Sequence, residues 1–150
     1  PTLGLDVAIR RQFLQGMIHL IQKKGKTVLF SSHILSDVER VVDRLAVIDK
    51  GVLRADCTLE QFRTSIRKVR AERTGPLPAG FDLPGILHCR QDDSVTEWIV
   101  VGATDEQLDQ AFGQAPVKGY TCVPMNMEDQ FIEFTSPVGN KRLFEWEERP

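Results

Sequence analysis

The sequence predicts an α/β fold for residues 1–58, a small α+β unit for residues 59–136 and a polar tail for residues 137–150. Three observations lead to this division. The first part runs in the order helix, continuous apolar strand, helix and hairpin, which is typical of an open α/β sheet. The second part alternates short helices with half-exposed strands. The charge also divides, because residues 1–58 hold 9 basic and 6 acidic residues (+3), whereas residues 59–150 hold 10 and 15 (−5).

Composition excludes several classes of protein. Hydrophobic residues make up 41% of the 150 residues and charged residues 27%, the balance of a globular chain. No apolar run reaches the ~18–20 residues that a membrane span needs, and a net charge of −2 argues against nucleic acid as a partner. The three cysteines are widely separated, which favours a reducing compartment, and their spacing fits no zinc pattern, so no metal site is predicted. Because the chain opens Pro1-Thr2 without a methionine, we expect it to be a piece of a longer protein.

Capping residues and periodicity predict the elements of the first part. Asp6 is a good N-cap and Gly25 a good left-handed C-cap for one helix. Residues 27–32 form an apolar run without alternation, which is typical of a strand covered on both faces of a parallel sheet. Ser36 and Glu39 have the spacing of a capping box and open a second helix. The apolar stripe of this second helix consists of Val38, Val41, Val42 and Leu45.

Turn residues and alternation predict the remaining elements. Asp49-Lys50-Gly51 joins two apolar runs and indicates a hairpin. Thr58 and Thr104, each followed three residues later by glutamine, are expected to cap two short helices. The strands predicted after Thr58 are residues 68–73, 86–91, 95–101 and 119–123, and a terminal helix carries Phe131, Ile132 and Phe134.

His33 is the residue of the first part best placed for chemistry. It stands just beyond the carboxyl end of the predicted covered strand, which is the edge where open α/β sheets bind ligands. An imidazole suits a phosphate contact because it donates a hydrogen bond and gains positive charge near neutral pH. Ser31 and Ser32 place hydroxyl groups at the same edge.

Two segments carry a family resemblance. Pro1-Thr2-Leu3-Gly4-Leu5-Asp6 resembles the D-loop of ABC transporter ATPases, and Ser31-Ser32-His33 resembles their switch-histidine loop, with 27 residues from Asp6 to His33. Residues 126–135 are similar to the acidic-aromatic helix that closes the accessory domain of export-type members. The resemblance therefore implies the C-terminal part of a P-loop NTPase core, from the D-loop onward, followed by an accessory domain.

The resemblance also implies roles for single residues. The histidine matching His33 is catalytic, since it contacts the γ-phosphate of ATP and helps to hold the attacking water, and Ser32 matches a supporting position at the nucleotide. Thr2, Gly4, Leu5 and Asp6 match the interface between two ATPase subunits. The chemistry is phosphoryl transfer to water. For the full-length family the resemblance implies ATP and Mg²⁺ as cofactors, a homodimer of ATPase subunits, a membrane permease as partner, and a cytoplasmic location at the inner face of the cell membrane.

Several parts of the family's machinery do not occur in the sequence. The Gly-x-x-x-x-Gly-Lys-Ser/Thr loop, the Leu-Ser-Gly-Gly-Gln signature and the Walker B carboxylates are all missing. We therefore expect the full-length form to couple ATP hydrolysis to transport, and the isolated chain to be inactive without bound cofactor. Two alternatives stay open: a small regulatory, ligand-binding or dimerisation module built on residues 59–136, and a structural fragment whose sheet edges lie open.

Overall fold

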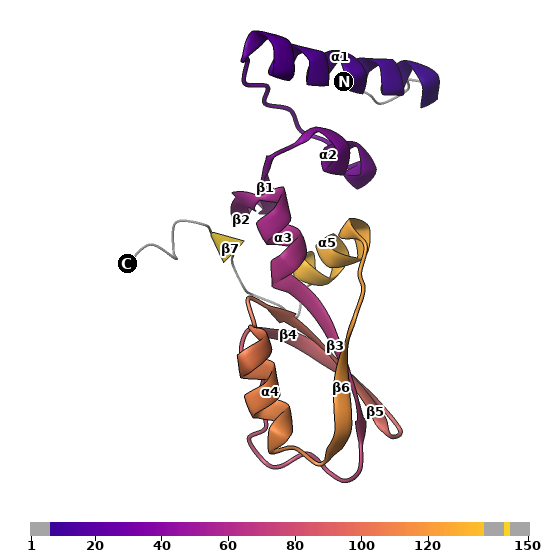
Figure 1. The fold of residues 1–150 in the computed structure, drawn as a ribbon, viewed down its shortest axis with the longest axis vertical. Coiled ribbons are helices and arrows are strands. Elements are labelled where there is room, and N and C mark those ends of the chain that lie inside the picture. The colour runs from indigo at the N-terminus through magenta and orange to yellow at the C-terminus, as the bar shows by residue number, and fades with distance from the viewer. Residues whose placement is uncertain (1–6, 137–142, 145–150) are drawn as a thin grey trace. The chain divides into compact units, whose positions relative to one another are not determined.

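The computed structural model describes residues 7–136 and 143–144, and the chain divides into two compact units, residues 1–42 and 43–150 (Figure 1). The first unit contains helices α1 (Val7–Lys24) and α2 (Leu35–Val41), and the second contains the strands and three further helices. The domain boundaries drawn from the sequence at residues 58 and 136 stay predictions. None of the described helices combines the length and the apolar character needed to cross a bilayer.

Helix α1 agrees with its predicted extent. It ends at Lys24, and the next residue, Gly25, has a φ of +55°, the left-handed conformation expected of a glycine C-cap. Leu14 and Met17, three residues apart, are its buried apolar side chains. The predicted N-cap, Asp6, lies outside the described residues.

The covered strand predicted over residues 27–32 is wrong for this chain. Residues 25–34 contain no regular structure, and the side chain of Leu29 is 98% exposed. A strand needs neighbours that accept and donate its backbone hydrogen bonds, and no described strand pairs with this segment. Among the described residues, the apolar run therefore has no sheet to cover it.

The second helix begins and ends earlier than predicted. Helix α2 starts at Leu35 with Ile34 in the N-cap position and no capping side chain, so the predicted Ser36–Glu39 capping box is wrong. The backbone becomes extended at Val42, and Leu45 belongs to the following strand. The apolar stripe thus combined residues from a helix and a strand.

The second unit opens with the predicted hairpin. Strands β1 (Arg44–Asp49) and β2 (Val52–Thr58) are antiparallel, and Lys50 and Gly51 both have positive φ between them, as a tight two-residue hairpin turn requires. Strand β7 (Leu143–Phe144) pairs parallel to β2. The sequence analysis assigned no regular structure after Ser136, and β7 corrects it for these two residues.

A four-stranded antiparallel sheet forms the centre of the second unit. Its strands are β3 (Ile66–Arg73), β4 (Ile86–Asp92), β5 (Val95–Val101) and β6 (Val117–Val123), in the order β4-β5-β3-β6. All of its pairings are antiparallel. The chain thus mixes helices and strands as predicted, but the described sheets are mainly antiparallel, and the expected parallel sheet does not occur among the described residues.

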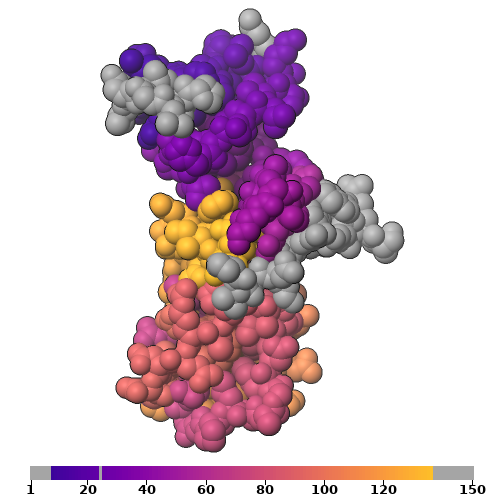
Figure 2. Space-filling model, turned by 180° about the vertical axis from the view of Figure 1, so that it is seen from behind, coloured from indigo at the N-terminus to yellow at the C-terminus, as the bar shows by residue number. Residues whose placement is uncertain are grey.

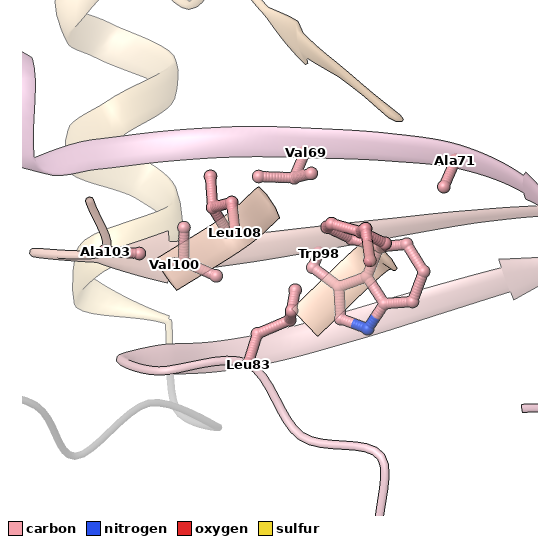
Figure 3. Close-up of a cluster of buried hydrophobic side chains, with 8 residues drawn as sticks. Val69, Ala71, Leu83, Trp98, Val100, Ala103 and Leu108 are labelled. Carbon is pink, nitrogen blue, oxygen red and sulfur yellow. The ribbon is translucent and has the colours of Figure 1, made fainter. Parts of the chain in front are cut away.

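One face of this sheet packs against helix α4 (Asp105–Gly113) and forms the main apolar core (Figure 3). Thr104 and Gln107 form the predicted capping box at the start of α4. Trp98 on β5 meets Phe112 of α4 edge-on, with ring centroids 5.3 Å apart. The buried members of this core are Val69, Ala71, Leu83, Trp98, Val100, Ala103, Leu108 and Phe112.

The other face of the sheet is covered at one end by α5 (Met127–Thr135), which packs beside α3 (Leu59–Ser65). Figure 2 shows the yellow atoms of α5 next to the purple atoms of α3 and its neighbouring hairpin. The rings of Phe62 and Phe134 meet edge-on at 5.5 Å. Gln130 donates from Nε2 to the Ile66 carbonyl at 3.0 Å, which fixes α5 to the start of β3.

Candidate functional site

His33 lies at a bend between α1 and α2, two residues before α2 begins. Its side chain is exposed. No hydrogen bond or ion pair from His33 to another residue occurs within the described part of the chain. Among the described residues of its unit, no hydrogen bond therefore fixes the tautomer of the imidazole.

Ser32 shapes the loop that carries His33. Its Oγ accepts a hydrogen bond from the Ile34 amide at 3.0 Å, which closes a short side-chain turn across His33. Ser32 is half-buried, whereas Ser31 is exposed. The structure thus places Ser32 beside His33, with one acceptor position of its hydroxyl already used by the backbone.

The predicted interface residues Thr2, Gly4, Leu5 and Asp6 lie outside the described residues, as does the whole D-loop segment, residues 1–6. Their roles stay predictions. What the structure describes is the helix that follows them directly, since α1 begins at Val7.

An ion pair that the sequence analysis missed joins the two helices of the first unit. Arg10 Nε of α1 lies 3.4 Å from Asp37 Oδ1 of α2. Asp37 is 3% exposed, and its second oxygen, Oδ2, has no hydrogen-bond partner among the described residues.

A shallow hollow lies between the helices and the loop of the first unit. Its lining combines an apolar wall with the two serines of the loop and the buried carboxylate. The lining residues are Phe13, Leu14, Met17, Phe30, Ser31, Ser32 and Asp37. Asp37 therefore borders the same space as the loop that positions His33.

A second polar cluster lies in the other unit, between α5 and strand β4. Glu133 is 7% exposed, with Oε2 2.8 Å from His88 Nε2 and Oε1 3.1 Å from Arg90 Nη1. Glu133 shares this cluster with two groups that can carry positive charge, which offsets the cost of burying a carboxylate. The cluster anchors α5 to the sheet. Glu128 and Asp129 lie in the first turn of the same helix, where negative charge suits the helix dipole.

The side chains present fit one part of a nucleotide site. An exposed imidazole with nearby hydroxyl groups suits contact with a terminal phosphate. The sequence holds no glycine-rich phosphate loop, and the described residues contain no group of three His, Cys, Asp or Glu side chains placed to hold a metal ion. The role of His33 and Ser32 at a nucleotide stays a prediction.

Comparison with known proteins identifies relatives along most of the chain. The chain is 29% identical over 141 residues to the ABC transporter ATP-binding protein YdbJ of Bacillus subtilis, and the alignment covers 91% of the chain. It is 24% identical over 149 residues to YtrB, another ABC transporter ATP-binding protein of that bacterium, covering 95%. It is also 28% identical over 137 residues to the Nod factor export ATP-binding protein I of Burkholderia orbicola, covering 90%.

These alignments cover 45–47% of the relatives, so the chain spans about half the length of the curated relatives that it matches. No family model matches the chain. No solved structure matches it either. The relatives that do match cover 90–95% of the chain and thus both of its units. They confirm the resemblance to ABC transporter ATPases that the two loops indicate.

Proposed function

We propose that this chain, a relative of the ABC transporter ATP-binding proteins, is the carboxyl-terminal portion of such an ATPase. Its residues 1–58 complete the nucleotide-binding core, and residues 59–136 form an accessory domain. The complete ATPase hydrolyses ATP with Mg²⁺ and works as a dimer at the cytoplasmic face of the cell membrane. A membrane permease uses the energy of hydrolysis for transport.

The observation that carries this proposal is the exposed imidazole of His33, on a loop with the family's sequence and at the family's distance from the D-loop segment. In the complete ATPase His33 donates a hydrogen bond to the terminal phosphate and helps to orient the attacking water. Positioning and charge stabilisation supply most of the rate in phosphoryl transfer. Ser32 sets the loop, and Thr2, Gly4, Leu5 and Asp6 contact the second subunit.

ATP with its Mg²⁺ supplies the phosphoanhydride bond that reacts. The chain's own residues hold only the hydrolysed end of that nucleotide. Nothing in the sequence cradles the other phosphates, so the 150-residue chain by itself neither binds ATP appreciably nor hydrolyses it.

The test is the substitution His33→Ala in the complete gene product. We expect kcat for ATP hydrolysis to fall by about 100-fold or more, because a transition-state contact is lost, while the Kd for ATP changes by less than about threefold. His19→Ala is the matched control, since His19 is also an exposed histidine of the first unit. The isolated chain, assayed alongside, should show no turnover. Unchanged kcat in His33→Ala would remove His33 from the mechanism.

A further inference from the structure

The Asp37 carboxylate of the first unit is buried without being fully partnered. Its side chain is 5% exposed, its nearest cation is the Arg10 guanidinium at 3.4 Å, and Oδ2 has no hydrogen-bond partner among the described residues. Burying a charge this way costs free energy unless the charge is paired. An exposed aspartate in the same first turn would serve the helix dipole equally well. The burial of Asp37 therefore needs an explanation other than helix stability.

The Arg10–Asp37 ion pair joins α1 to α2. Helix α1 follows the D-loop segment, and α2 follows the loop that carries His33. Arg10 is in the first turns of α1, which starts directly after the D-loop segment, and Asp37 is in the first turn of α2, which starts two residues after His33. Between the helices, residues 25–34 have no regular structure of their own. The path of this loop is therefore fixed where its two flanking helices are held together.

Asp37 also borders the loop itself. The hollow that it lines is shared with Ser31 and Ser32, and Ser32 closes the turn over His33 through its bond to the Ile34 amide. A shift of Asp37 would move the start of α2, and Ile34 with it, because the Asp37 amide donates to the Ile34 carbonyl at 3.1 Å. The chain of contacts runs from Arg10 to Asp37, to Ile34, and to the turn that carries His33.

We propose that Arg10 and Asp37 are positioning residues for His33, holding the switch loop and the start of α1 in one arrangement for catalysis. The inference rests on the proposed ATPase function. It assigns no substrate contact to either residue, so both act only through the loop.

The experiment is a double-mutant cycle in the complete ATPase. Asp37→Asn, which is isosteric, and Arg10→Gln remove the ion pair from opposite sides. Each should lower kcat by about 10-fold while KM for ATP changes by less than about twofold. Arg10→Lys, which keeps the charge, should restore kcat to within about threefold of the parent. In a His33→Ala background, Asp37→Asn should cause no further loss of kcat, because residues that act through one group are not additive.

The control is Asp56→Asn, which removes a different ion pair, Arg44 Nε to Asp56 Oδ1 at 2.7 Å in the second unit; its kcat should stay at the parent value. As a readout independent of turnover, amide exchange at Ile34 in the 150-residue chain should speed up in Asp37→Asn and not in Asp56→Asn. An additive loss in the His33→Ala background, or unchanged exchange at Ile34, would overturn the positioning role.

The two proposals fail in different ways. If His33→Ala itself leaves kcat unchanged, the proposed function fails. If His33→Ala abolishes turnover but Asp37→Asn and Arg10→Gln do not reduce it, the proposed function stands and the positioning role is wrong.

Discussion

The two units of the chain differ in how completely they bury their apolar side chains. In the second unit Phe62, Leu108 and Phe134 are 0% exposed and Trp98 is 2% exposed. In the described part of the first unit, by contrast, Leu29 is 98% exposed. Further large apolar side chains of α1 are open to solvent, namely Ile9, Phe13 and Leu20.

This contrast teaches that stability and chemistry are carried by different parts of the chain. The second unit has a buried core between its four-stranded sheet and α4, although Ile48 and Ile132 are exposed outside that core. The first unit holds the residues that the family resemblance assigns to catalysis, yet it offers few buried apolar contacts to stabilise them. Regions with few buried apolar contacts open locally at low free energy. The loop that carries His33 should therefore depend on polar contacts of its own unit, such as the Arg10–Asp37 ion pair.

The largest expected effect tests the core of the second unit. Trp98→Ala removes a buried ring that packs against Phe81 and Phe112, so we expect the free energy of unfolding to fall by about 3–5 kcal/mol. Urea unfolding followed by far-ultraviolet circular dichroism measures it. Phe13→Ala in the first unit is the control, because a ring that is 37% exposed should cost no more than about 2 kcal/mol. Equal losses in the two variants would break the comparison between the units.

The accuracy of the sequence analysis follows the same division. The second unit was predicted well, since its hairpins, strands and capped helices are specified by local signals such as Thr104 with Gln107 or Lys50-Gly51. The strand predicted at residues 27–32 is wrong because a strand needs neighbouring strands, and none of the described strands pairs with this segment. The sequence alone places His33 in the loop after residues 27–32. How that loop is held depends on the proposed contact between Arg10 and Asp37, which are far apart in the sequence.

The polar contacts show the same limit. Neither the Arg10–Asp37 pair nor the cluster around Glu133 has a sequence pattern of its own, because each joins residues 27 and 43–45 positions apart. Charge spacing within one helix is readable from sequence. Pairing between elements requires their packing to be known first.

A smaller effect tests how firmly α4 is held against β6. The Tyr120 hydroxyl donates to Asp109 Oδ1 at 2.7 Å, and this bond to a carboxylate raises the pKa of Tyr120 to about 12. Tyr120 is the single tyrosine of the chain, so tyrosinate absorbance reports it directly. We expect a midpoint near pH 12 in the folded chain and near the ordinary value of about 10 in urea.

The sign of the linked effect on stability follows from this shift. Because the folded-state pKa is raised, the stabilising contribution is complete below about pH 10 and is lost as the pH rises toward 12. Asp109→Ala should move the midpoint of Tyr120 ionisation in the folded chain toward pH 10. At pH 7 it should lower the free energy of unfolding by no more than one hydrogen bond contributes, about 1 kcal/mol. A midpoint near 10 in the unsubstituted folded chain would show that α4 and β6 do not hold this contact.

The smallest expected effect tests the open first unit. Leu29→Ser replaces a side chain that is 98% exposed, and an exposed position with no packing partner should change the free energy of unfolding by less than about 0.5 kcal/mol. Val69→Ser is the contrasting variant, since Val69 is 0% exposed in the core of the second unit, and its loss should exceed about 2 kcal/mol. A loss above about 1 kcal/mol for Leu29→Ser would mean that other residues cover the loop of residues 25–34 in solution. The two units would then bury their apolar side chains to a more similar extent than the structure indicates. If that loss occurs only in the complete gene product, the cover over Leu29 comes from the remainder of the proposed ATPase.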